Sequence, residues 1–195
     1  SKFKISAAEP FDLYHSNLQR PLSGILAETH GDLRGENIWI DPYLDLHVVD
    51  WRGHGLKHIF RDYVSLEIDL RLSVLERFSK QPHFKHWFAA ESTFTTIETE
   101  ISPTATASLA NPFSASKDEA DLWKKLYQVI GQIRLCALKG TGRKRGPEYA
   151  MSLFMSATEE MATQQDPRRQ IVLMALSLAF AKDLRPAAIA NSPSA

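Results

Sequence analysis

The chain has little of several features that would point directly to a class of function. Its 195 residues contain one cysteine, Cys136, so no internal disulfide can form, and a reducing, cytoplasmic setting is the simplest expectation. No apolar run reaches the roughly 18 residues that a membrane span needs. The 23 Lys and Arg balance the 23 Asp and Glu, which gives no global reason to expect a nucleic-acid or membrane-surface partner.

Glycine is also scarce where a nucleotide-binding loop would need it. The segment GTGRKRG, residues 140–146, lacks the spacing of a phosphate-binding P-loop and does not follow a predicted strand. We therefore interpret it as a solvated loop between helices. The residues before His30 contain no Gly-rich loop either, and Lys2 and Lys4 lie in no clear strand. The sequence thus contains no recognisable Gly-rich cradle for a phosphate.

The most informative segment is THGDLRGENIWIDPYLDLHVVD, residues 29–50. His30, Asp32 and Asn37 form an H-x-D-x-x-x-x-N pattern, and two short apolar segments then lead to Asp50. This order is typical of a phosphoryl-transfer catalytic loop followed by a metal-binding aspartate. An aspartate can orient and deprotonate an acceptor hydroxyl, which suits Asp32. Amide and carboxylate oxygens suit Mg²⁺, which favours Asn37 and Asp50 as its ligands.

The surrounding residues predict a mainly α fold of the α+β type. Residues 37–41 and 47–50 predict a small β-hairpin, with Asp41 and Asp45 as turn residues. Residues 62–78 predict a helix with too many apolar positions for one narrow stripe, so we expect it to be buried on most sides. Further helices are predicted at 12–19, 83–90, 96–101, 118–138, 147–161 and 168–182. Cys136 lies in an apolar helical pattern and is expected in the core, and Trp39 and Trp51 are also expected to pack.

The length predicts a single domain, which we place at residues 1–188. Within it we expect the catalytic loop and hairpin at 28–55 and a connection rich in Ser, Thr, Ala and Pro at 92–117. A helical subdomain should follow at 118–183. The tail at 186–195 is rich in Ala, Pro and Ser, which predicts disorder.

HGDLRGEN followed by VVDW resembles the catalytic segment of the aminoglycoside phosphotransferase and choline kinase-like family, within the protein-kinase-like fold. That family typically reads H-G-D-x-x-x-x-N-I, then I-D-W or I-D-F. The resemblance covers about residues 25–75 and implies ATP with Mg²⁺ as cofactor and a small-molecule hydroxyl as acceptor. It implies Asp32 as catalytic base, Asn37 and Asp50 as metal ligands that bind the nucleotide, and His30 as a brace for the loop.

The same resemblance assigns places to two more side chains. Asp62, in RDYVSLEIDL, occupies the position of a further aspartate that opens a helix and supports the catalytic loop, so we expect a structural role for it. Arg34 stands where many small-molecule kinases of this type have a histidine and protein kinases have a lysine. It is a candidate catalytic residue in contact with the transferring phosphate, or it pairs with Glu36.

A complete family member also has an upstream β-rich lobe, with a phosphate-covering loop and a lysine. Neither is recognisable before His30, so we expect the helical C-terminal lobe alone, cut from a longer protein or naturally reduced. Two hypotheses follow. In the first, the full-length protein transfers a phosphoryl group from ATP to a small-molecule hydroxyl. In the second, the chain is a catalytically weak or inactive binding or regulatory module of a larger multidomain bacterial protein. A metallophosphoesterase is disfavoured, because its D-x-H and N-H-[DE] partners are absent.

Overall fold

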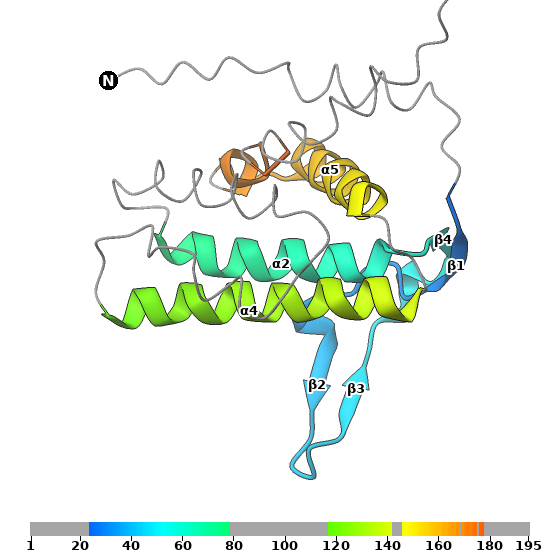
Figure 1. The fold of residues 1–195 in the computed structure, drawn as a ribbon, viewed down its shortest axis with the longest axis horizontal. Helices are drawn as coiled ribbons and strands as arrows, with labels where there is room; N and C mark the ends of the chain where they lie inside the picture. Colours follow the sequence, from blue (N-terminus) through cyan, green and yellow to red (C-terminus); the bar gives the residue numbers. More distant parts are fainter. Residues whose placement is uncertain (1–23, 79–116, 142–145, 168, 175, 178–195) are drawn as a thin grey trace, which may run out of the picture.

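The computed structural model is α-rich, with two small antiparallel sheets, which confirms the mainly α, α+β class (Figure 1). It describes residues 24–78, 117–141, 146–167, 169–174 and 176–177. Its elements are β1 (Leu26–Thr29), the 3₁₀ turn η1 (Gly35–Asn37), β2 (Ile38–Ile40), β3 (Leu46–Val48), the 3₁₀ turn η2 (Trp51–Gly53), β4 (Gly55–His58), α2 (Arg61–Phe78), α4 (Lys117–Gly140) and α5 (Gly146–Thr163). The helices expected at 12–19, 83–90 and 96–101, the tail at 186–195 and all of the 92–117 connection before Lys117 lie outside the described residues.

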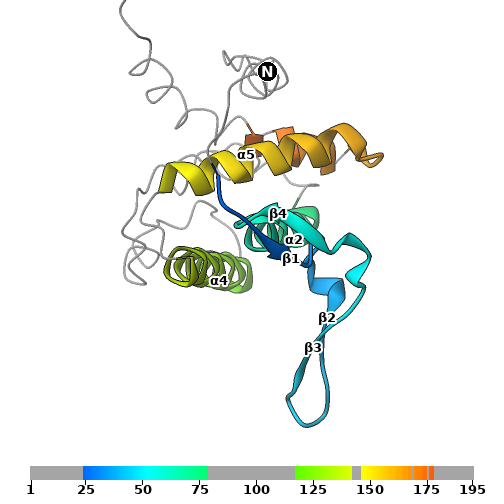
Figure 2. The same cartoon turned by 90° about the vertical axis from the view of Figure 1, so that its right-hand side faces the viewer.

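The predicted hairpin is confirmed. β2 pairs antiparallel with β3, with Ile38 opposite Val48. Asp41 closes the turn, because its Oδ1 accepts hydrogen bonds from the backbone N–H groups of Tyr43 (2.8 Å) and Asp45 (3.0 Å). Figures 1 and 2 show this hairpin projecting away from the helices. A second antiparallel pair, β1 with β4, lies beside the N-terminal end of α2. It joins the segment that precedes the hairpin to the segment that follows it.

α2 packs against both α4 and α5, and it lies between them in Figure 1. Four core side chains that are at most 2% exposed recur every four residues, beginning just before the helix: Phe60, Val64, Ile68 and Leu72. Of residues 61–74, only Ser73 is exposed, which confirms that the helix is buried on most sides. None of the described helices is long and apolar enough to cross a membrane.

A charged cluster lies inside this core, at the meeting point of the three helices. Glu67 of α2 is fully buried and accepts two hydrogen bonds from the equally buried Arg71, at 3.1 and 2.8 Å. Arg134 of α4 donates two more, at 3.0 and 2.7 Å. The hydroxyl of Tyr149 on α5 donates a fifth, at 2.8 Å. Burial alone would raise the pKa of Glu67, but the charges of Arg134 and Arg71 outweigh it and lower the pKa from 4.5 to about 2.

Three expectations about packing were wrong. Trp51 is 55% exposed, although its ring lies edge-on to His30. Cys136 is exposed on α4, whereas its neighbour Ala137 is fully buried. Because each helical residue turns by about 100°, only one of the two can face the core. Trp39 is 64% exposed on the hairpin, where its indole N–H donates to the backbone oxygen of Glu36 (3.1 Å). Among the described residues, no second layer covers this hairpin, which projects from the body.

Candidate functional site

The loop that follows β1 is attached at both ends to side chains of α2. The Asp62 carboxylate accepts hydrogen bonds from the backbone N–H groups of His30 (2.8 Å) and Gly31 (2.7 Å). Two helical turns further on, the Asp69 carboxylate accepts one from the backbone N–H of Gly35 (2.9 Å). The expectation that Asp62 supports this loop is therefore confirmed. Asp69, the second anchor, was not predicted.

Gly31 lies where the loop comes closest to η2. Its φ of +84° is in the left-handed region that favours glycine. A Cβ atom added at Gly31 would overlap the backbone carbonyl oxygen of Gly53 and approach the ammonium group of Lys57. The loop therefore needs glycine here for two independent reasons, its backbone conformation and its close packing.

Gly31→Ala is expected to lower the free energy of unfolding by at least about 2 kcal/mol, because left-handed strain adds to steric overlap. Urea denaturation followed by circular dichroism measures the loss. Gly55→Ala is the matched control, since the space around Gly55 is open and its φ is not in the left-handed region. Equal stability of the two variants would contradict this account of Gly31.

His30 connects the loop to the residue that follows β3, at the base of the hairpin. Its Nε2 is 2.8 Å from the backbone oxygen of Val49, which can only accept, so Nε2 carries the proton. The backbone N–H of Val49 donates in turn to the backbone oxygen of Asn37 (3.0 Å). Trp51 lies edge-on to the His30 ring, with centroids 4.8 Å apart. These contacts hold the residue before Asp50 against both ends of the H-x-D-x-x-x-x-N motif.

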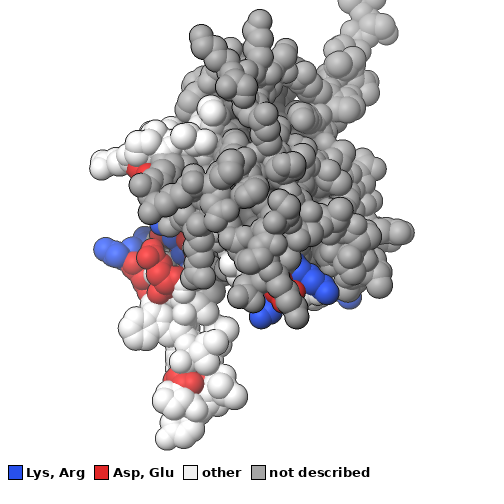
Figure 3. Space-filling view, turned by 90° about the vertical axis from the view of Figure 1, so that its left-hand side faces the viewer, with Lys and Arg blue, Asp and Glu red and all other residues white. Residues whose placement is uncertain are grey.

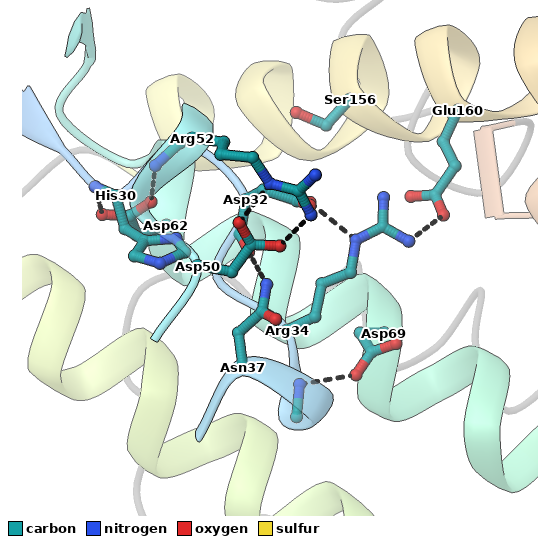
Figure 4. A network of polar contacts seen from close by, with 12 residues as sticks. His30, Asp32, Arg34, Asn37, Asp50, Arg52, Asp62, Asp69, Ser156 and Glu160 are labelled. Carbon is teal, nitrogen blue, oxygen red and sulfur yellow. Dashed lines mark hydrogen bonds and ion pairs between the residues drawn. The ribbon is translucent and has the colours of Figure 1, made fainter. Parts of the chain in front are cut away.

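Asp32 presents its carboxylate, 47% exposed, beside the guanidinium of Arg34 (Figure 4). Arg34 Nε donates to Asp32 Oδ1 at 2.6 Å, and Nη1 lies 3.4 Å from Glu160 of α5. Arg34 thus pairs with these two acids and not with Glu36, the alternative partner that the sequence left open. Burial alone would lower the pKa of Arg34, but the hydrogen bond to Asp32 and the charges of both acids raise it.

Asn37 is buried in η1, and its side chain has a fixed orientation. Its Nδ2 donates to the backbone oxygen of Asp32 at 2.9 Å. The amide oxygen is the remaining polar atom of the side chain, and it accepts no hydrogen bond from the described residues. Asn37 therefore keeps one uncommitted oxygen next to the loop that carries Asp32, as a metal ligand would.

Asp50 has an unusual backbone conformation for a residue other than glycine. Its φ of 61° and ψ of 59° are left-handed, a conformation that costs on the order of 1–3 kcal/mol and is common at functional sites. Arg52 donates to both oxygens of its carboxylate, at 2.5 and 2.6 Å. These hydrogen bonds lower the pKa of Asp50. The carboxylate is thus ionised but occupied by an arginine.

The candidate ligands Asn37 and Asp50 fit Mg²⁺ only when the ion is bound to a nucleotide. Among the described residues, no group of three or more His, Cys, Asp or Glu side chains is arranged to hold a metal ion. Asn37 and Asp50 supply one amide oxygen and one carboxylate. Mg²⁺ commonly takes so few protein ligands when phosphate oxygens and water complete its coordination. The pair therefore fits Mg²⁺ that arrives with a nucleotide, provided that Arg52 moves off Asp50.

Three contributors to the site were missed by sequence reasoning: Asp69, Arg52 and Glu160. Arg52 is two residues from Asp50, the same spacing as Arg34 from Asp32, and this repeated Asp-x-Arg spacing is a signal that could have found it. Glu160 lies on a helix far along the chain, where no local pattern marks it. Figure 3 shows acidic and basic side chains next to one another just above the mostly uncharged hairpin.

No family model, no curated protein and no solved structure matches the chain. The resemblance of residues 25–75 to phosphotransferases therefore stays a prediction from the sequence, and the function is proposed from the chemistry of these side chains.

Proposed function

We propose that the chain is the helical lobe of a kinase-like phosphotransferase, which in its full-length context moves the γ-phosphoryl group of Mg²⁺-ATP to a small-molecule hydroxyl. The observation that carries the proposal is the linked placement of Asp32, Asn37 and Asp50. The Asn37 side chain donates a hydrogen bond to the backbone oxygen of Asp32, and the Asn37 backbone oxygen accepts one from Val49, the residue that precedes Asp50. A candidate base and two candidate metal ligands thus form one connected unit.

In this proposal each side chain has one task. Asp32 accepts the proton of the acceptor hydroxyl through a carboxylate oxygen, while the hydroxyl oxygen attacks the γ-phosphorus and ADP leaves. Asn37 Oδ1 and the Asp50 carboxylate would hold the metal ion. The bound Mg²⁺ would neutralise phosphate charge. Asp62 and Asp69 keep the loop in place by accepting its backbone hydrogen bonds.

The arrangement of the elements supports the kinase-like lobe as well. The loop, a hairpin and the candidate metal ligand precede a long helix, α2, whose first turn supports the loop. Two further helices, α4 and α5, pack on α2. This order agrees with the expected lobe in which one hairpin carries the chemistry.

A second candidate function is a binding or regulatory module with weak or no catalysis. One observation favours it: both candidate acids are paired with arginines. Arg34 occupies one oxygen of Asp32, and Arg52 occupies both oxygens of Asp50. A module that never binds a metal ion would keep these pairs permanently, whereas an enzyme must open them.

Calorimetric titration of the chain with ATP, with and without Mg²⁺, distinguishes the two. Asp50→Asn is expected to weaken the Mg²⁺-dependent binding of ATP by more than about tenfold, because a carboxylate ligand is lost. Arg52→Gln is expected to strengthen it by about threefold, because an exposed competing ion pair is removed. The two substitutions therefore act in opposite directions.

Asp45→Asn is the matched control, since the Asp45 side chain is exposed in the hairpin turn and makes no hydrogen bond with the described residues. It should leave ATP binding unchanged. ATP binding that is indifferent to Mg²⁺ and to both Asp50→Asn and Arg52→Gln would overturn the proposed function in favour of the binding module.

A further inference from the structure

The chain contains two Asp-x-Arg pairs that differ in one respect. In the pair of Asp50 with Arg52, the guanidinium binds both carboxylate oxygens, through Nε and Nη2. In the pair of Asp32 with Arg34, only Nε donates, and only to Oδ1. Asp32 Oδ2 accepts no hydrogen bond from the described residues. The same two residue types at the same spacing thus give a two-point contact in one place and a one-point contact in the other.

Glu160 is a second carboxylate beside the Arg34 guanidinium. It approaches from α5, with its side chain 19% exposed, and its Oε1 lies 3.4 Å from Arg34 Nη1. Figure 4 shows the Arg34 guanidinium between the two carboxylates, with Asp32 on one side and Glu160 on the other. The Arg34 guanidinium is therefore shared between Asp32 and Glu160, whereas both contacts that Arg52 makes go to Asp50.

Fold stability does not explain why Glu160 is there. Burial raises the pKa of Glu160, and the nearby carboxylates of Asp69 and Asp32 raise it further, against the opposing charges of Arg34 and Arg169. A raised folded pKa means that the protonated acid stabilises the fold. That stabilisation is present at low pH and is lost as pH rises through the folded pKa. The ionised form of Glu160 is thus kept at a cost to stability, as is common at functional sites.

We propose that Glu160 is a positioning residue for the phosphoryl transfer described above: it holds Arg34 through Nη1 and so keeps Asp32 Oδ2 open for the acceptor hydroxyl. This inference rests on the proposed function. When Glu160 is neutralised, Arg34 turns to bind both oxygens of Asp32, as Arg52 binds Asp50. A two-point charge-assisted contact then competes with the hydroxyl for the base.

The test is Glu160→Gln in the full 195-residue chain. ADP release from Mg²⁺-ATP is measured with a mixture of aminosugars and choline as hydroxyl acceptors. We expect kcat to fall by about tenfold and the KM for Mg²⁺-ATP to change by less than about twofold. In an Arg34→Gln background, Glu160→Gln should have no further effect on kcat, because the group that it positions is gone. An unchanged kcat in the single variant would overturn the inference.

Glu159→Gln is the matched control, because Glu159 is the adjacent residue on α5 and pairs with Arg61 at 3.2 Å instead of Arg34. It should leave kcat unchanged. Thermal unfolding separates positioning from a structural role. Glu160→Gln should keep the wild-type Tm or raise it by about 1–3 °C, since the costly charge is removed. A Tm lowered together with kcat would assign Glu160 to the fold and overturn the inference.

The proposed function and the inference fail in different ways. Turnover that survives Asp32→Asn removes the proposed function, whereas turnover lost in Asp32→Asn but intact in Glu160→Gln removes only the inference.

If the chain releases no ADP, NMR of the Arg34 Nε–H group tests whether Glu160 positions Arg34. Glu160→Gln should shift that resonance, which is identified by its loss in Arg34→Gln, and Glu159→Gln should leave it in place. An unmoved resonance would also overturn the inference.

Discussion

Asp32→Asn is expected to lower turnover by about 10²–10⁴-fold, the usual contribution of a general base, while the chain stays folded. Asparagine has the same shape, and its side-chain oxygen can still accept the hydrogen bond from Arg34 Nε. It cannot take up the proton of an acceptor hydroxyl. Asp32 is also half exposed, so its replacement leaves no buried charge behind. This variant should therefore lose turnover and still fold as the wild type does.

Turnover is measured as ADP release from Mg²⁺-ATP, and folding as the Tm. Asp45→Asn makes the same chemical change in the hairpin turn and should leave both quantities at their wild-type values. A Tm within about 2 °C of wild type is expected for Asp32→Asn, because surface substitutions have small effects on stability. Wild-type turnover in Asp32→Asn would show that another group accepts the proton.

Glu67→Gln is expected to lower the free energy of unfolding by about 3–5 kcal/mol, the cost of removing one partner from a buried ion pair. Glu67, Arg71 and Arg134 are almost completely buried, and both arginines donate to the Glu67 carboxylate. The substitution keeps the shape of the side chain but removes its charge. Two guanidinium groups are then left in the core without their shared counter-charge. Urea denaturation measures the loss.

The same carboxylate gives the chain an acid-sensitive part of its stability. The pKa of Glu67 falls from 4.5 to about 2 on folding, so the unfolded chain binds more protons between these values. Stability is therefore fully present above about pH 4.5 and is lost as the pH falls towards 2, by about 3 kcal/mol. In Glu67→Gln this contribution to the pH dependence should be absent, and its curve should be flatter than that of wild type over this range.

Glu159→Gln is again the matched control, since the Glu159 side chain is 48% exposed in its pair with Arg61. An exposed pair of this kind contributes at most about 1 kcal/mol. A loss in Glu67→Gln no larger than in Glu159→Gln would mean that the helices do not depend on the buried cluster.

Local patterns in the sequence were enough to predict the hairpin, α2 and the loop that carry the candidate site. Two short segments rich in β-branched and aromatic residues marked the hairpin, and the apolar residues of 62–78 marked α2. The spacing of His30, Asp32, Asn37 and Asp50 also identified the loop that the structure ties to the end of the hairpin. These features are predictable because each depends on residues close together in the chain.

Contacts between distant segments could not be predicted in this way. Glu67 lies 67 residues from Arg134 and 82 from Tyr149, and in the sequence it is one acid among 23 Asp and Glu. Glu160 reaches Arg34 only because α5 packs across α2. Cys136 was assigned to the core because an apolar run does not show which of two adjacent helical residues faces inward. Tertiary packing decides all three.

The two anchors on α2 limit how long the loop can be. Asp62 and Asp69 are seven residues apart on one helix, which corresponds to about 10 Å along its axis. The four-residue step from Gly31 to Gly35 can span at most about 14 Å when fully extended. Removing one residue would reduce this reach to roughly 10–11 Å and leave almost no slack. The loop can therefore gain a residue and still reach both carboxylates, whereas a loop one residue shorter would be fully stretched between the two anchors.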